Sequence, residues 1–314
     1  MSRFGGLSRQ LVMNMNDIVV TGATGVVGRR AVRELVAAGH RVAGVTRSAR
    51  GRRLLEGLGA RVIEADVFDP ASMTDAFAGA DVVVNLLTHI PPAHRIPRPD
   101  AWDENDRLRR EASAAIARAA QAAAAQRLVQ ESVAFVYADG GDGWLDEDAP
   151  LATAGTTATA LTAETNASEL FAGDTVLLRF GLFMGPDSHL TQANVEDARA
   201  GLSPSLGRRD GHRPTLWLDD AATAVAAALG VPAGTYNVAD EDPPTRAEID
   251  AALAAVVGRD ALRPAVDPVP PIFEPVARSQ RVSSRRLREA GGWEPRVRAG
   301  TDGWCLVTEG LLAA

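Results

Sequence analysis

The sequence predicts an α/β fold in which a doubly wound parallel sheet is followed by a smaller C-terminal lobe. Short apolar segments alternate with helical segments up to residue 179, as they do where crossover helices join parallel strands. A glycine-rich turn links the first apolar segment to the first helix. From about Phe180, proline and glycine become more frequent and the expected helices become short.

The expected elements follow from the apolar pattern. Strands are predicted at residues 18–20, 41–46, 61–67, 81–87, 127–132 and 175–179. The segment 81–87 is rich in Val and Leu without alternation, which indicates a strand buried on both faces. Helices are predicted at residues 29–36, 71–78, 105–126, 159–171, 220–229 and 245–257.

The turn Thr21–Gly28 carries glycines at every third position. Glycines at this spacing permit a tight turn, leave the backbone bare and let the helix pack closely on the strand. A pyrophosphate then binds the free N–H groups at the helix N-terminus. We therefore predict a Rossmann unit that binds a dinucleotide through Gly22, Thr24, Gly25, Val26, Val27 and Gly28.

The type of dinucleotide is predicted from Thr46, Arg47 and Ser48, which end the second strand about 20 residues past the glycine turn. An acid at this place binds the free 2′-hydroxyl of NAD and repels a phosphate. Here there is no acid, and a guanidinium beside a hydroxyl suits a 2′-phosphate. We therefore predict NADPH or NADP as the cofactor, held by Arg47 and Ser48.

These features give the expected domain boundaries. Residues 15–179 are predicted to form the Rossmann dinucleotide-binding domain. Residues 180–314 are predicted to form mainly a smaller substrate-binding lobe, with some segments returning to the sheet. Residues 1–14 are expected to be a disordered leader.

The composition excludes several other classes of protein. The chain has 46% hydrophobic and 23% charged residues, as an ordinary globular protein does. A net charge of -7 argues against a nucleic-acid binder, and no segment is long and apolar enough to span a membrane. The only cysteine is Cys305, so no internal disulfide forms and a cytoplasmic location is expected. No spacing of ligand residues resembles a metal site, and the oligomeric state is left open.

At this point the sequence resembles the extended short-chain dehydrogenase/reductases, in their epimerase/dehydratase branch. The resemblance extends from Ile18 to about Trp293 and rests on the following matches: the glycine turn, Asp66-Val67, Asn105, Ser132 to Tyr137, Arg179 with Gly185-Pro186, Trp217 to Ala222, Gly234 to Val238, and Gly292 to Pro295. It implies adenine contacts from Asp66 and Val67, and further cofactor contacts from Leu86, Leu87 and Gln130.

The chain departs from this family in its catalytic residues. The family uses Tyr-x-x-x-Lys, in which a tyrosinate moves the proton while lysine lowers the pKa of the tyrosine. The resemblance places Thr156 at the tyrosine position, Ala160 at the lysine position and Val133 at the usual Ser/Thr position. The chain contains no lysine at all, so no lysine elsewhere takes over.

A working reductase is the function that these departures favour. Among atypical relatives, the chain resembles NADPH-dependent ketoreductases of bacterial aromatic polyketide (angucycline-type) biosynthesis. It is therefore predicted to reduce a ketone on a polycyclic or lipophilic small molecule. A cofactor-binding regulator without turnover is one alternative. A sugar-nucleotide epimerase or dehydratase is another, but it must first oxidise a carbinol, which needs a base.

A reductase without the tyrosine needs another source for its proton. Four side chains are considered from the sequence, namely Ser132, Thr88, His89 and Tyr137. None is expected to be indispensable, because the substrate itself or water is predicted to supply the proton. The apolar pocket for the substrate is predicted from the residues after the sixth strand, Phe180, Leu182, Phe183 and Met184.

Overall fold

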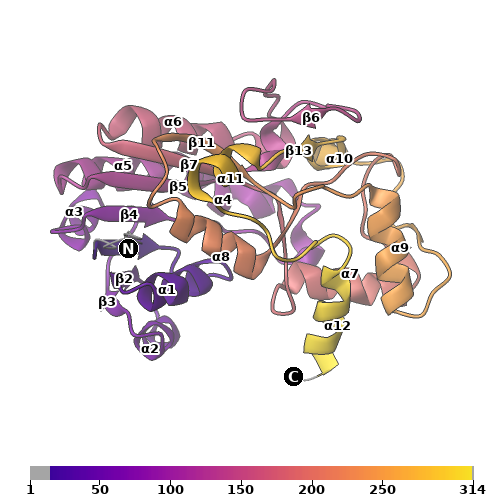
Figure 1. The fold of residues 1–314 in the computed structure, drawn as a ribbon, viewed down its shortest axis with the longest axis horizontal. Helices are drawn as coiled ribbons and strands as arrows, with labels where there is room; N and C mark the ends of the chain where they lie inside the picture. The colour runs from indigo at the N-terminus through magenta and orange to yellow at the C-terminus, as the bar shows by residue number, and fades with distance from the viewer. Residues whose placement is uncertain (1–14, 313–314) are drawn as a thin grey trace, which may run out of the picture.

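The computed structural model describes residues 15–312. The expected leader, residues 1–14, lies outside the described residues. Figure 1 shows a central sheet with helices on both faces and a second group of helices beside it. This arrangement confirms the predicted doubly wound α/β fold.

The central sheet has seven parallel strands in the order β11-β7-β5-β4-β1-β2-β3. The strands are β1 (Asp17–Thr21), β2 (Arg41–Val45), β3 (Arg61–Ile63), β4 (Val82–Asn85), β5 (Arg127–Val133), β7 (Asp174–Phe180) and β11 (Gly234–Val238). All six predicted strands are present. The seventh, β11, comes from the C-terminal part of the chain and pairs with β7 at the edge.

Helices cover the two faces of the sheet and close two apolar cores. On one face α1 (Gly28–Ala37) packs between α8 (Leu218–Ala227) and α2 (Ala49–Gly57). On the other face lie α3 (Pro70–Ala76), α5 (Ser113–Ala122) and α6 (Ala160–Leu170). Because both faces are covered, β4 is buried along its whole length and begins with three valines, as its sequence predicted.

The helix predicted at residues 105–126 is divided in the structure. It consists of α4 (Asp103–Arg107), a π-helical turn at Leu108–Ala112 and α5. It ends at Ala122 because Ala124 has a positive φ of 53°, which a right-handed helix does not allow. The π-turn brings the buried side chains of Leu108, Arg109 and Ala112 toward the sheet.

Most of the remaining chain forms the lobe beside the carboxyl ends of the strands, whereas α11 (Arg285–Gly291) packs against β11 in the core of the sheet. Its core joins α7 (His189–Arg199), α9 (Arg246–Val256) and α12 (Gly303–Leu312) to the pair β8 (Leu182–Met184) and β10 (Thr215–Trp217). The smaller elements are β6 (Trp144–Leu145), β9 (Leu202–Ser203), β12 (Arg263–Pro264), β13 (Arg281–Val282) and α10 (Glu274–Ala277). The sequence did not predict α7 or α12.

An ion-pair cluster joins the lobe to the first helix of the sheet. Arg30 on α1 pairs with Asp187 at 2.9 Å and with Asp219, in the first turn of α8, at 3.1 Å.

The described residues include no helix that is long and apolar enough to cross a membrane.

Candidate functional site

The glycine turn has the geometry that a bound pyrophosphate needs. Gly22 has a φ of +70°, and a Cβ there would lie 2.5 Å from the carbonyl oxygen of Leu86. A Cβ on Gly28 would lie 2.0 Å from the carbonyl oxygen of Gly22, so only glycine lets α1 pack this closely on the turn. Gly25 is exposed, so its bare backbone faces solvent.

The N-terminus of α1 is open to an anion. No described residue accepts a hydrogen bond from the backbone N–H groups of Val26, Val27 or Gly28. The first turn of α1 contains no acid, and Val27 at the N-cap carries no capping side chain. These free donors and the positive end of the helix fit the pyrophosphate of a dinucleotide.

The loop after β2 places the predicted cofactor-selecting residues at one edge of this turn. Ser48 caps α2, where its hydroxyl accepts a hydrogen bond from the N–H of Gly51 at 2.9 Å. The Arg47 side chain is 65% exposed, and its guanidinium lies 3.6 Å from the carboxylate of Asp66. Arg47 is therefore free to reach a ligand phosphate, and Asp66 helps to orient it. This pairing joins two residues that the sequence assigned to the same nucleotide.

Polar residues at the ends of β1 and β4 and in the middle of β5 are fixed by a buried chain of hydrogen bonds. Thr21 donates to Asn85 at 2.7 Å, and Asn85 donates to Gln130 at 2.8 Å. Leu86 follows Asn85 and is buried, whereas Leu87 and Val67 are partly exposed. The predicted contacts Leu86 and Leu87 thus lie along the edge where the strands end, which is where ligands bind in such sheets, and Gln130 is joined to that edge through Asn85.

Ser132 and Tyr137 belong to a buried network centred on Arg179 and Glu164. Ser132 donates to Glu164 at 2.5 Å, and Arg179 pairs with the same carboxylate at 2.7 Å. Tyr137 donates to Asn237 at 2.7 Å and accepts from Arg179 at 3.0 Å. Burial raises the pKa of the Tyr137 hydroxyl, although the Arg179 charge acts against it.

Thr156 lies in a 3-10 turn (Gly155–Thr157) before α6 and Ala160 is the first residue of α6, at the positions where the resemblance expected the tyrosine and the lysine. Thr156 is 9% exposed and Ala160 is 1% exposed. The carbonyl of Thr156 accepts a hydrogen bond from Arg109 at 3.4 Å. Neither side chain can remove a proton from a carbinol at neutral pH. The structure therefore has no proton-transferring side chain at the two positions where the family carries its tyrosine and lysine.

Three comparisons with known proteins bear on this geometry. Residues 18–239 match the model of the NAD dependent epimerase/dehydratase family. The chain is 32% identical, over 91% of its length and 98% of the relative, to a 3-diazoavenalumate denitrifying reductase from a Streptomyces species. It is 29% identical to a 2-alkyl-3-oxoalkanoate reductase from Shewanella oneidensis, covering 83% of this chain and 70% of that protein.

The solved structures agree in fold. The enzyme WbmG from Bordetella bronchiseptica, in complex with NAD, has a TM-score of 0.76 and 21% identity, covering 97% of this chain and 96% of that chain. The match over residues 18–239 decides the matter. The chain belongs to the NAD-dependent epimerase/dehydratase family. The predicted family is therefore confirmed, together with the expectation of an NAD(P)-dependent oxidoreductase.

Of the other proposed proton donors, Thr88 and His89 follow β4 in this family member. Thr88 is partly exposed and His89 is exposed. The backbone N–H of His89 donates to Asn105 Oδ1 at 3.0 Å, which fixes the loop but leaves the imidazole free. Both residues therefore keep an accessible side chain, unlike Ser132 and Tyr137. Whether any of the four gives a proton stays a prediction.

The residues predicted to form the substrate pocket lie mostly in packed cores. Phe180 is 1% exposed and Met184 is 2% exposed, in the sheet core and the lobe core respectively. Leu182 and Phe183 are partly buried, and the rings of Phe180 and Phe183 are 5.3 Å apart. Leu182 and Phe183 thus keep some exposed surface, whereas Phe180 and Met184 are enclosed in the cores, so the predicted pocket stays a prediction.

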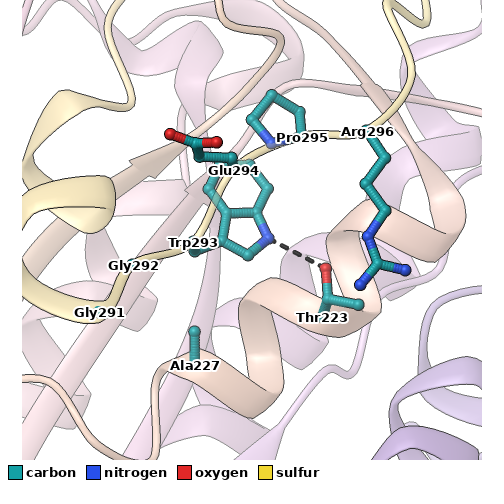
Figure 2. Close-up of a pocket in the computed structure, with 8 residues that line it drawn as sticks. All are labelled: Thr223, Ala227, Gly291, Gly292, Trp293, Glu294, Pro295 and Arg296. Atoms are coloured by element: carbon teal, nitrogen blue, oxygen red, sulfur yellow. Dashed lines mark hydrogen bonds between the residues drawn. The ribbon is translucent and has the colours of Figure 1, made fainter.

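A separate surface pocket of about 430 Å³ lies between α8 and the segment after α11 (Figure 2). It is lined by Thr223 and Ala227 of α8 and by residues 291–296, and Trp293 donates to Thr223 at 3.0 Å. The carbonyl of Ala228, beside this pocket, binds Arg127 at the first residue of β5. The pocket therefore lies toward the amino ends of the strands, away from the glycine turn.

Two buried residues that the sequence did not single out, Arg109 and Glu131, lie near each other, and Arg109 also contacts Thr156. Arg109, from the π-turn, is 4% exposed, and its guanidinium is 4.0 Å from the carboxylate of Glu131 on β5. The sequence signal that could have identified Glu131 is a charged residue inside the predicted strand β5, whereas Arg109 stands among other charged residues in Leu108–Ala112. Among the described residues, no group of three potential ligands is placed to hold a metal ion.

Proposed function

We propose that the protein is an NADPH-dependent reductase that acts on a small, lipophilic acceptor without the Tyr-x-x-x-Lys pair. The observation that carries this proposal is the buried Thr156 and Ala160 at the two catalytic positions of the family, in a chain without lysine. NADPH, when bound, supplies the hydride. The residues of this chain bind it, orient it and exclude water from the reacting centre.

The preference for NADPH over NADH rests on Arg47 and Ser48. Arg47 extends into solvent beside the cap of α2, and no acid occupies the end of β2. The Arg47–Asp66 contact is exposed and 3.6 Å long, so it costs little to exchange for a phosphate. A guanidinium and a phosphate form a stronger, charge-assisted pair.

The acceptor is proposed to carry an anionic group, because the lobe buries an arginine that forms no ion pair among the described residues, although the charge of Asp250 acts on it at longer range. Arg213 is 9% exposed, its Nε donates no hydrogen bond within the described residues, and burial lowers its pKa to about 10. Burial also lowers the pKa of the nearby Arg246 to about 10, and the charge of Arg213 adds to this. The names of both relatives describe carboxylates, an oxoalkanoate and an avenalumate.

Two kinds of acceptor fit a site without a tyrosine acid. One is a ketone, including the polycyclic ketone of an aromatic polyketide, in which a neighbouring hydroxyl already binds the carbonyl oxygen. The other is an aryl diazo acid, favoured by the Streptomyces relative, because hydride addition releases nitrogen gas and needs no proton. An epimerase reaction has less support, since its first step requires a base.

The test is consumption of NADPH with a panel of acceptors. The panel holds polycyclic ketones, 3-oxo acids, aryl diazo acids and their methyl esters, with UDP-glucose as the comparison. We expect oxidation of NADPH with at least one acid and weaker binding of its ester. Turnover of UDP-glucose alone favours the epimerase. Binding of NADPH without turnover of any acceptor, together with capture of one protein partner, favours the regulator.

A further inference from the structure

Three buried polar residues lie near the ends of β4 and β5, and two of them, Asn105 and Glu131, lack hydrogen-bond partners for side-chain atoms. Asn105 is fully buried, and its Nδ2 donates no hydrogen bond within the described residues. Glu131 is 4% exposed, and no described residue donates a hydrogen bond to its carboxyl oxygens. Arg109 lies one helical turn beyond Asn105 and reaches Thr156 and Glu131 at 3.4 and 4.0 Å.

Such a cluster costs free energy unless it has a use. A buried carboxylate without hydrogen bonds loses its hydration and regains little from a guanidinium at 4.0 Å. Burial accordingly raises the pKa of Glu131, the charge of Glu164 adds to this, and the charge of Arg109 opposes it. Buried polar groups left unpaired in a native protein are unusual and gather at functional sites.

The cluster lies where the family keeps its reacting groups. Side chains alternate along a strand, so Glu131 shares a face of β5 with Val133, which stands at the family's Ser/Thr position. Arg109 binds the carbonyl of Thr156, which stands at the tyrosine position. Ser132, between them, turns to the other face and binds Glu164. Glu131 is therefore a buried acid that shares a strand face with the family's Ser/Thr position and is linked through Arg109 to the tyrosine position.

We propose that Glu131, held beside Arg109, donates the proton when a ketone is reduced. This rests on the proposed function and assigns to a side chain the role that the sequence left to the substrate or to water. As hydride adds to the carbonyl carbon, the C=O π pair moves to oxygen, and that oxygen takes the proton of the Glu131 carboxyl. The new carboxylate lies beside Arg109, and water returns its proton.

The placement of Glu131 beside the nicotinamide is tested without any acceptor. The oxidised nicotinamide ring is cationic and the reduced ring is neutral, so an ionised Glu131 favours NADP⁺ over NADPH. We expect the ratio of the two dissociation constants to shift toward NADP⁺ by about tenfold as the pH rises through the ionisation of Glu131. The other charges around Glu131 are Arg109 and Glu164, the latter paired with Arg179. His89 is the nearby imidazole, fixed through Asn105.

The decisive variant is Glu131→Gln, which keeps the shape and cannot ionise. The shift of the ratio with pH should vanish in it and persist in His89→Ala. The matched control is Glu147→Gln, since Glu147 is also buried with a raised pKa but is bonded to Asn237 outside this cluster. A wild-type ratio that does not change with pH, or a change that survives in Glu131→Gln, overturns the placement.

Activity tests the proton itself, with a 3-oxo acid from the acceptor panel as the ketone. Glu131→Gln should lower kcat by 10²–10⁴-fold, as expected for loss of a general acid, while the affinity for NADPH stays the same. Glu131→Asp, which keeps a carboxyl group, should recover part of the lost kcat. This variant also controls for the possibility that Glu131→Gln loses activity because it misfolds. Full kcat in Glu131→Gln overturns the proposal and leaves the reductase intact. If the wild type reduces no acceptor, the proposed function is wrong. The pH dependence of the ratio of the NADP⁺ and NADPH dissociation constants then still tests whether Glu131 lies beside the nicotinamide.

Discussion

Arg47 is the residue on which the choice between the two dinucleotides depends. Its guanidinium is held only by an exposed contact with Asp66, so it is available to a 2′-phosphate. Arg47→Ala should weaken NADPH binding by about 1–3 kcal/mol, the value of a charge-assisted contact, and should leave NADH binding almost unchanged. Fluorescence titration of both reduced cofactors measures this.

The control for Arg47 is Arg53→Ala, which removes an exposed arginine of the neighbouring α2. It should change both affinities little, since a general loss of positive charge is screened at physiological salt. Equal or tighter binding of NADH by the wild type contradicts the predicted preference.

The four side chains considered from the sequence should divide into two groups. Ser132 and Tyr137 bind inside the buried Arg179–Glu164 network, so Ser132→Ala and Tyr137→Phe should reduce the free energy of unfolding by about 1–3 kcal/mol. Thr88→Ala and His89→Ala should leave stability unchanged. In all four variants, kcat with saturating NADPH should stay within about tenfold of the wild-type value. This decrease is much smaller than the decrease expected when a general acid is removed.

Denaturant titration and steady-state kinetics on the same four proteins check this division. A thousandfold fall in kcat in any one of them, with cofactor binding kept, identifies that residue as the donor. In that case the role proposed for Glu131 is wrong.

Sequence reasoning reaches single residues only where local geometry decides their role. Alternation along β5 was enough to suspect that Ser132 points away from Val133, and its hydroxyl does bind Glu164. The Arg109–Glu131 contact was not predictable, because it joins residues 22 positions apart through a π-turn that the sequence does not mark. Arg109 looked like one more exposed arginine on an alanine-rich helix.

At the scale of elements, the first turn and α1 form a unit that binds the pyrophosphate. Gly25→Val should abolish cofactor binding, because a side chain would occupy the exposed backbone that the phosphates approach. The protein should still fold, because a Cβ on Gly25 lies 3.2 Å from the nearest backbone atom and meets only slight crowding. Titration with NADPH, with circular dichroism as a check on folding, measures both.

Gly57→Val is the matched control for this unit. Gly57 ends α2, and a Cβ there meets nothing within 4 Å. The variant should bind NADPH as the wild type does. Retained binding in Gly25→Val would show that the dinucleotide does not cross the glycine turn.

The elements that the sequence predicted are those with a strong local pattern. The six strands and the glycine turn follow from apolar runs and from positions that only glycine can occupy. The helix α12 was missed because Gly303 and Gly310 disfavour a helix, and the packing of Trp304 and Val307 in the lobe core overrides that propensity. The dinucleotide site could be predicted because it is formed largely by one short continuous motif. The arrangement of the lobe could not, because its helices are stabilised by contacts between residues far apart in the sequence.

At the scale of the whole molecule, two buried acids hold the C-terminal segment against the sheet and the lobe. Asp220 accepts from the backbone N–H groups of Arg296 and Val297 at 3.0 and 3.1 Å. Asp240, which follows β11, accepts from Thr215 at 2.6 Å and from the N–H of Gly300 at 3.2 Å. Burial raises the pKa of Asp240 to about 7, and the charge of Asp220 adds to this.

The raised pKa of Asp240 makes stability depend on pH. Since the folded-state pKa of about 7 exceeds the ordinary value of 3.8, the folded protein binds this proton more tightly than the unfolded chain. The stabilisation is complete below pH 3.8 and is lost as the pH rises through about 7. Asp240→Asn should flatten this part of the dependence of Tm on pH. An unchanged pH dependence in the variant contradicts the raised pKa.

At the level of its reaction, we expect this family member to transfer hydride without a catalytic tyrosine and lysine. The most direct measurement uses NADPH deuterated at the transferring position of the nicotinamide C4 and follows the label by mass spectrometry. With an oxo acid or a diazo acid that consumes NADPH, we predict one deuterium in the product, in the wild type and in Tyr137→Phe alike. Consumption of NADPH without label in the product, or loss of transfer in Tyr137→Phe, would contradict the account.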